Sequence, residues 1–194
     1  MEIRLNRPQS LAHQRLQPGN SLALPWGRGI GKSKFIRLFW YEQIARWDGV
    51  VREGVSDGLH YRQRGIRLVL LMPTFKACKD VHQEQVEQEL LARGAEWEFL
   101  GAKVDRTRWH FSFPGGSSIQ WFGTREANSA RGIRADGVTA DECDDIDPGV
   151  IDGVVKPWFS EKWSLKMQLT GGTPRRGRYG LLYREHRKGL ERKG

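Results

Sequence analysis

The sequence has few cysteines, no long apolar run and fewer acidic than basic residues. Only Cys78 and Cys143 occur among its 194 residues, so no disulfide framework is implied and a reducing compartment is expected. No apolar run approaches the roughly 20 residues that span a bilayer. The N-terminal "MEIRLNRPQS" lacks the apolar region of a signal peptide. The sequence therefore predicts a soluble, intracellular protein with no membrane partner.

The shortage of acidic residues leaves a large positive charge. The chain has 32 Lys and Arg against 23 Asp and Glu, a formal net charge of +9. This excess favours polyanionic partners such as nucleic acid, although many basic proteins never contact DNA. A hydrophobic content of 38% and eight tryptophans indicate a folded globule. The length suits one domain over residues 1–194.

Strand-like and helix-like stretches alternate along the chain. We expect strands at 21–25, 65–73, 136–142 and 164–172, helices at 33–47, 74–93 and within 146–159, a hairpin in 108–123, and a C-terminal helix after residue 178. Val81, Val86 and Leu90 form the expected apolar stripe of the second helix, and the Gly-rich segment 47–65 is predicted to be an exposed loop. This order predicts an α/β fold with a mostly parallel sheet, helices on both faces, and ligands at the carboxyl ends of the strands.

The stretch "LPWGRGIGKSK" at 24–34 is similar to a phosphate-binding loop, G-x-x-x-x-G-K-[ST], between a strand and a helix. Gly31, Lys32 and Ser33 match its end, but Trp26 stands where the first glycine belongs. We expect Gly27 to take over the tight turn that this glycine normally makes. Lys32 then supplies the charge for phosphates and Ser33 the hydroxyl for Mg²⁺. The alternative is a Gly-rich turn in which Ser33 caps a helix.

Two adjacent carboxylates follow a later strand, in "RADGVTADECDD". A Mg²⁺ ion bound with a triphosphate needs a carboxylate near its hydroxyl ligand, and hydrolysis needs a second one to orient or deprotonate water. We expect Asp141 and Glu142 to point in different directions, so that Asp141 serves the metal and Glu142 the water. The alternative is a solvated acidic turn, because three more aspartates follow in the same run.

A third segment, "LTGGTPRRGRYG", begins at the end of another predicted strand. Its hydroxyls can lie near a γ-phosphate, and its Gly-Gly pair is expected to let the backbone move. By itself, Gly-Thr-Pro is also typical of an ordinary turn. The three segments together therefore carry more weight than any one of them.

In this order, over about residues 23–183, these segments resemble the ATPase domain of large terminase subunits, which package DNA into tailed-phage and herpesvirus capsids. "WGRGIGKS" is similar to that family's Walker A motif, in which an arginine precedes Gly-x-Gly-Lys and the first glycine is often replaced. "VLLMPTFKA", "FPGGSSIQWFG", "SARGIRADGVTADECDDI" and "LTGGTPRRGRYGLLYREH" resemble its following strand, its hairpin, its Walker B block and its coupling motif. The resemblance implies a P-loop NTPase of the ASCE type.

The resemblance also implies roles for individual residues. Arg28 would contact or sense the γ-phosphate, and Thr173 would couple hydrolysis to motion. Arg131, with Arg134 as the second choice, matches the arginine that a neighbouring subunit supplies in a ring; a solvated arginine or a DNA contact is the alternative. The segment 1–20 would lie on the adenine side, with Gln9 near the base. The implied nucleotide-binding residues are Trp26, Gly27, Arg28, Gly29, Ile30, Gly31, Lys32 and Ser33.

The implied function is ATP hydrolysis with Mg²⁺ in the host cytoplasm, by identical subunits in a ring that drive double-stranded DNA into a capsid. The portal and the small terminase subunit would be partners. Large terminases continue into a nuclease domain, whereas this sequence ends with the basic segment 174–194. Two other functions stay open. One is a helicase-type nucleic-acid-dependent ATPase, and the other is a nucleic-acid-binding protein with a vestigial phosphate loop. Basic charge interleaved with Trp26, Trp109 and Trp121 suits the second, although aromatic residues at strand spacing are more often core.

Overall fold

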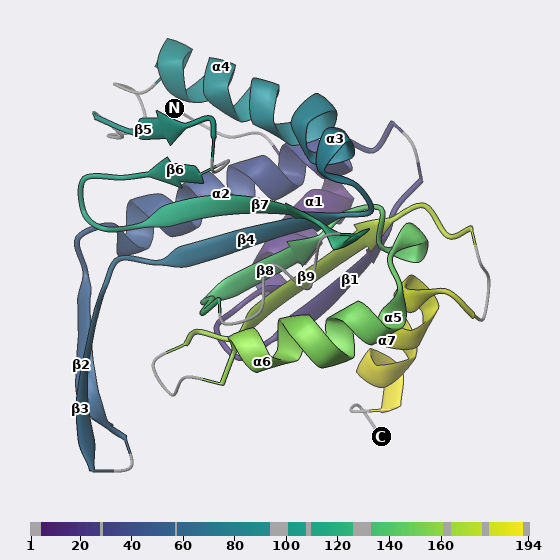
Figure 1. Ribbon diagram of the computed structural model, residues 1–194. Helices are drawn as coiled ribbons and strands as arrows, with labels where there is room; N and C mark the ends of the chain where they lie inside the picture. The colour runs from purple at the N-terminus through teal and green to yellow at the C-terminus, as the bar shows by residue number, and fades with distance from the viewer. Residues whose placement is uncertain are drawn as a thin grey trace.

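The computed structural model describes residues 5–27, 29–56, 58–93, 101–107, 110–125, 133–160, 164–175 and 179–191. In this part of the chain, a central seven-stranded sheet has the order β1-β9-β8-β4-β7-β6-β5 (Figure 1). Its strands are β1 (Ser21–Pro25), β4 (Arg67–Met72), β5 (Lys103–Asp105), β6 (His110–Ser112), β7 (Ser118–Gly123), β8 (Gly137–Ala140) and β9 (Met167–Gly172).

Five neighbouring strands, β1, β9, β8, β4 and β7, are parallel. At one edge β6 pairs antiparallel with β7, and β5 pairs antiparallel with β6. The strand before the glycine-rich loop, β1, and the strand before the acidic pair, β8, are separated by β9. The ends of all three strands therefore meet at one edge of the sheet. This arrangement confirms the predicted fold class, including the hairpin within 108–123, which is formed by β6 and β7.

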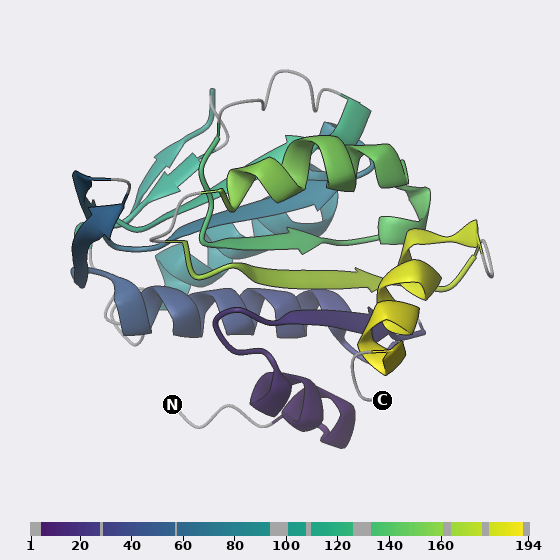
Figure 2. The same cartoon turned by 90° about the horizontal axis from the view of Figure 1, so that it is seen from below.

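Helices cover both faces of the sheet, as predicted (Figure 2). One face carries α2 (Lys32–Trp47), with α1 (Arg7–Arg15) beyond it, and the long helix formed by α3 (Phe75–Cys78), a π-helical turn η1 (Lys79–Gln83) and α4 (Glu84–Arg93). The other face carries α7 (Leu181–Glu191) and a helix formed by α5 (Pro148–Val150), a π-helical turn η4 (Ile151–Val155) and α6 (Lys156–Trp158). A short 3-10 turn, η3 (Cys143–Asp145), follows β8.

The central strand β4 shows why the sheet needs two helical layers. Its side chains alternate between the two hydrophobic cores: Leu68, Leu70 and Met72 face α2 and α4, whereas Val69 and Leu71 face the other layer. All five are at most 2% exposed. A strand buried on both faces has a continuous apolar sequence, so the prediction for 65–73 is confirmed.

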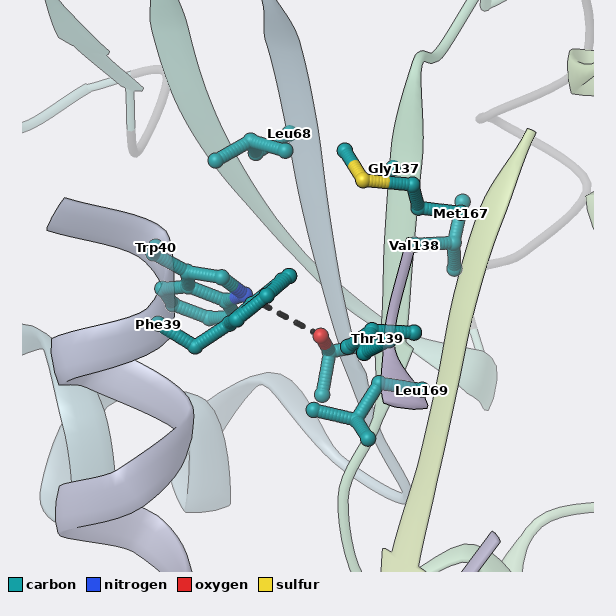
Figure 3. Close-up of a pocket in the computed structure, with 9 residues that line it drawn as sticks. Phe39, Trp40, Leu68, Gly137, Val138, Thr139, Met167 and Leu169 are labelled. Atoms are coloured by element: carbon teal, nitrogen blue, oxygen red, sulfur yellow. Dashed lines mark hydrogen bonds between the residues drawn. The ribbon is translucent and has the colours of Figure 1, made fainter. Parts of the chain in front are cut away.

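A polar contact inside the first core fixes α2 over β8. The indole N–H of Trp40 donates to the hydroxyl of Thr139 over 3.0 Å, beside a cavity of about 10 Å³ between α2 and the sheet (Figure 3). Both residues are buried. Because a buried N–H is costly without a partner, this bond favours one register of α2 against β8, the strand that precedes Asp141.

The prediction of an exposed loop at 47–65 is wrong. The segment forms an antiparallel ribbon, β2 (Val51–Ser56) and β3 (Leu59–Arg64), which projects from the domain (Figure 1). Its base is held by Arg52, whose guanidinium lies 2.6 Å from the buried carboxylate of Asp136. A ribbon with little buried surface needs no apolar alternation, which explains why its sequence shows none.

The apolar stripe predicted for helix 74–93 is partly wrong. Val86 and Leu90 are buried, but Val81 is 37% exposed. The stripe continues instead through His82 and Cys78, both fully buried.

Among the described residues, none of the helices has the length and apolar character that a membrane span requires.

Candidate nucleotide-binding site

The glycine-rich loop turns at two glycines other than the one expected. Gly29 and Gly31 have φ values of 86° and 80°, whereas Gly27 lies outside the left-handed region. The expectation that Gly27 takes over the tight turn is therefore wrong. Only glycine adopts such φ values without strain, so the two later glycines make the path from β1 into α2.

The helix that follows begins with the lysine. Gly31 is the N-cap of α2, Lys32 is its first residue, and Ser33 lies one position inside it. The alternative in which Ser33 caps the helix is therefore ruled out. The hydroxyl of Ser33 lies 3.4 Å from Oδ2 of Asp141. The positive end of the α2 dipole and two of its first side chains thus face the end of β8.

Lys32 bridges both carboxylates of the acidic pair. Its Nζ lies 2.7 Å from Oδ1 of Asp141 and 2.9 Å from Oε1 of Glu142. The side chains of Lys32 and Asp141 are only 9% and 1% exposed. Burial by itself raises the pKa of the Asp141 carboxyl, but the hydrogen bond from His82 and the charge of Lys32 lower that pKa to about 2. Burial lowers the pKa of Lys32, yet Asp141 and Glu142 together raise it above its ordinary value.

The two carboxylates converge instead of pointing in different directions, which corrects the sequence-based expectation. Glu142 has a φ of 50°, a left-handed conformation that is uncommon for a residue with a side chain. This turn brings its carboxylate to the same lysine that Asp141 contacts. Glu142 is 32% exposed, so it alone of the pair reaches solvent.

The strand β9, which lies between β1 and β8, leaves room for the contact of Lys32 with the two carboxylates. A Cβ on Gly171 of β9 would lie 3.2 Å from Cδ of Lys32 and 3.4 Å from Oδ1 of Asp141, and one on Gly172 would lie 3.3 Å from the backbone N of Cys143. Both glycines are buried strand residues. Both positions leave space for the lysine and the acidic turn; that the Gly-Gly pair lets the backbone move stays a prediction. Thr173 follows them directly and is half-buried.

The acidic run after the pair is not simply solvated. Asp144 is 3% exposed, and its carboxylate accepts the backbone N–H of Arg175 over 2.8 Å and that of Leu182 over 3.0 Å. It therefore ties the end of β8 to the segment that follows Thr173 and to the start of α7. The guanidinium of Arg175 pairs with Asp145 over 2.9 Å.

Sequence reasoning missed His82, whose ring contacts Asp141 of the acidic pair. Its Nε2 lies 2.9 Å from Oδ2 of Asp141. A signal was present: Cys78, His82, Val86 and Leu90 recur every four residues, which places the histidine on the buried face of a helix. A single histidine on such a face does not by itself indicate a site.

Gln9 lies against the glycine-rich loop. Its side-chain amide N–H groups donate to the carbonyls of Ile30 and Gly31 over 3.2 Å each, and its oxygen accepts the backbone N–H of Asn6 over 3.0 Å. Asn6 and Gln9 form a capping box at the start of α1. The helix α1 thus supports the loop through Gln9; that Gln9 reads adenine stays a prediction.

The comparisons with known structures give one consistent result. The chain is similar to the large terminase ATPase domain of Thermus phage P74-26 (TM-score 0.67, 16% identity, 89% of this chain and 66% of that one). It is also similar to the large terminase of a thermophilic bacteriophage (0.72, 13%, 98% and 44%) and to that of bacteriophage HK97 (0.72, 12%, 100% and 38%). The chain has the fold of a large terminase ATPase domain. No protein-family model and no curated protein matches the sequence.

The chain spans less than half the length of the last two of these large terminases. Two residues to which the terminase resemblance gave roles, Arg28 and Arg131, lie outside the described residues, as does Trp109. Arg134 precedes β8, so it lies at the end of that strand opposite to Asp141. Trp26 packs on Phe35 with ring centroids 5.4 Å apart.

The residues of this site fit a magnesium ion. The Ser33 hydroxyl and the Asp141 carboxylate are hard oxygen ligands, which Mg²⁺ prefers. Within the described residues, no group of three His, Cys, Asp or Glu could form a metal cage. Mg²⁺ is usually held by one or two protein oxygens together with substrate phosphates, and this pair of oxygens matches that pattern.

Proposed function

We propose that this domain is the ATP-hydrolysing motor domain of a viral large terminase subunit, which drives double-stranded DNA into a preformed capsid. The observation that carries the proposal is the buried contact of Lys32 with Asp141 and Glu142, made between a glycine-rich loop and a strand end in a terminase ATPase fold. The large terminase of the thermophilic bacteriophage has been solved in complex with ATP-gamma-S and with ADP, which supports a nucleotide as the ligand.

The roles follow from where the side chains lie. Lys32 exchanges its carboxylate partners for the β- and γ-phosphates, while the N–H groups of the loop and of the first turn of α2 bind phosphate oxygens. Ser33 and Asp141 hold Mg²⁺, which when bound neutralises charge on the phosphates. Glu142, released from Lys32 and open to solvent, orients and deprotonates the attacking water. Thr173, directly after β9, couples hydrolysis to motion of the segment before α7.

Two further parts of the proposal rest on the sequence. Arg28 contacts the γ-phosphate, and Arg131 of one subunit completes the site of its neighbour in a ring. An isolated subunit lacks that arginine, so it is expected to bind Mg·ATP but to hydrolyse it slowly. Double-stranded DNA, the portal and the small terminase subunit are the expected partners, the positive charge of the chain contacting DNA.

The proposal is tested by nucleotide binding and turnover in matched variants. Lys32→Ala is expected to abolish binding of a fluorescent ATP analogue with Mg²⁺. Glu142→Gln is expected to bind it normally while losing roughly 10²–10⁴-fold in single-turnover hydrolysis, the usual contribution of a general base. Lys34→Ala, two residues further along the same helix and exposed, is the control. Circular dichroism confirms folding of each variant.

Three outcomes separate the competing functions. Wild-type turnover in Glu142→Gln would remove the assignment of the catalytic base. Absence of any Mg·ATP affinity in the wild-type protein would favour a nucleic-acid-binding protein with a vestigial loop. ATP-driven separation of duplex strands, measured with a labelled duplex, would favour a helicase-type motor over one that packages DNA.

A further inference from the structure

His82 is a fully buried histidine that the mechanism above does not use. It is 0% exposed, and its Nε2 lies 2.9 Å from Oδ2 of Asp141. Its Nδ1 is buried and has no hydrogen-bond partner among the described residues. The carboxylate of Asp141 faces the ammonium group of Lys32 over 2.7 Å, and an ionised carboxylate only accepts hydrogen bonds. The ring therefore carries a proton on Nε2 and donates it to Asp141.

The local structure brings this ring to the site. His82 lies in η1, a π-helical turn between α3 and α4, and such single turns within α-helices are frequent at functional sites. The ring also packs against Trp40 of α2, with centroids 5.9 Å apart. Trp40 is in turn bonded to Thr139, two residues before Asp141 (Figure 3). The ring is thus held between α2 and the end of β8.

The donors divide between the two oxygens of Asp141. Oδ1 receives Lys32 and the backbone N–H of Glu142, at 2.7 Å and 2.9 Å. Oδ2 receives His82 at 2.9 Å, while the Ser33 hydroxyl is at the limit of hydrogen-bonding distance, 3.4 Å. When Lys32 moves to a phosphate, His82 still holds Oδ2. The carboxylate then keeps its orientation toward Ser33, and Oδ1 loses its strongest partner.

We propose that His82 is a positioning residue, which holds the Asp141 carboxylate in the orientation that binds Mg²⁺ together with Ser33. The inference rests on the proposed function, because it deepens the role of the same site. Hydrogen-bond partners of metal-binding carboxylates typically contribute about 10–100-fold to metal affinity. His82 is expected to act through the metal and not through the affinity for the nucleotide itself.

The first experiment measures how the binding of a fluorescent ATP analogue depends on Mg²⁺ concentration. His82→Leu, which keeps bulk but not the donor, is expected to raise the half-saturating Mg²⁺ concentration about 10-fold. His82→Gln keeps an N–H donor and is expected to stay near the wild-type value. Gln83→Leu is the matched control, because this neighbouring side chain is also buried. An unchanged Mg²⁺ dependence in His82→Leu, or an equal change in Gln83→Leu, overturns the proposal.

The second experiment uses the nucleotide-free protein, so it does not depend on ATP binding. A long-range ¹H–¹⁵N spectrum, with His82 assigned by its loss in His82→Gln, shows which ring nitrogen is protonated. A proton on Nε2 is expected; a proton on Nδ1 alone would overturn the proposal, since Nε2 could then not donate. If the wild-type protein binds no Mg·ATP while the Nε2 proton is present, the proposed function fails and the metal role of His82 fails with it. The hydrogen bond itself then stands.

Discussion

Asp144 provides a quantitative test of how the acidic turn is joined to the C-terminal helix. Its two oxygens accept the backbone N–H groups of Arg175 and Leu182, and it is 3% exposed. A Cβ on Gly180 would lie 2.4 Å from Oδ1 of Asp144, although the φ of Gly180 suits any residue. The two substitutions Asp144→Ala and Gly180→Ala therefore act on the same contact, from opposite sides.

The expected magnitudes follow from the contacts. A hydrogen bond to a charged group contributes about 1.5–3 kcal/mol, so losing two predicts that Asp144→Ala lowers the free energy of unfolding by about 4 kcal/mol. Gly180→Ala forces the carboxylate to move and is expected to cost about 2 kcal/mol, as in other overpacked sites. In the double variant the methyl group meets no carboxylate. The double variant is therefore expected to lose as much free energy of unfolding as Asp144→Ala alone.

Urea denaturation of the three variants measures the coupling between the two sites. Asp147→Ala is the control within the same acidic run, because this exposed residue caps the short helix α5 and is expected to cost about 1 kcal/mol. If the losses of the two single variants simply add in the double variant, Asp144 does not occupy the space beside Gly180. The link between the acidic turn after β8 and α7 is then not as described.

Two further predictions concern other buried groups. Cys78 and Cys143 are both fully buried, and burial, followed by the charges of Asp144 and Asp141, raises the pKa of the Cys143 thiol to about 12. The native protein is therefore expected to react slowly with a thiol reagent at pH 8 and to expose two reactive thiols in guanidinium; rapid reaction at Cys143 in the native state would contradict this. Arg52→Leu leaves the buried carboxylate of Asp136 without its guanidinium and is expected to lower the free energy of unfolding by about 3 kcal/mol. Arg62→Leu, from an exposed pair on the same ribbon, is expected to change it by less than about 0.5 kcal/mol; equal losses would show that Arg52 does not anchor the ribbon.

The fold and the two sides of the site were predictable because each has a local signal. The strand β4 is a continuous apolar run between Gly65 and Pro73, and the loop before Lys32 has glycines at fixed spacing. Parallel strands bring their carboxyl ends to one edge, so the meeting of Lys32 with Asp141 followed from the order of the elements. The distance of 2.7 Å between Nζ of Lys32 and Oδ1 of Asp141 agrees with this prediction, whereas a large separation would have contradicted the site.

What the sequence did not predict depends on tertiary packing or on backbone conformation. The ribbon β2–β3 has little buried surface, so its residues show no alternation. The left-handed backbone of Glu142 could not be predicted, because glutamate rarely adopts this conformation. The helix α1 did have a signal, the capping pair Asn6 and Gln9 around Pro8. The long-range partners of Gln9, the carbonyls of the glycine-rich loop, have no local pattern.

The burial of Asp141 has a consequence for the order of events at the site. A carboxylate that is 1% exposed is costly unless positive charge or hydrogen bonds compensate it. In the free protein Lys32 supplies that charge at 2.7 Å, while His82 supplies a hydrogen bond at 2.9 Å. Lys32 can therefore leave for a phosphate at low cost only if another cation takes its place beside Asp141. Under the proposed function, ATP with Mg²⁺ satisfies this condition and ATP alone does not, so phosphate binding by Lys32 and metal binding by Asp141 are expected to be coupled.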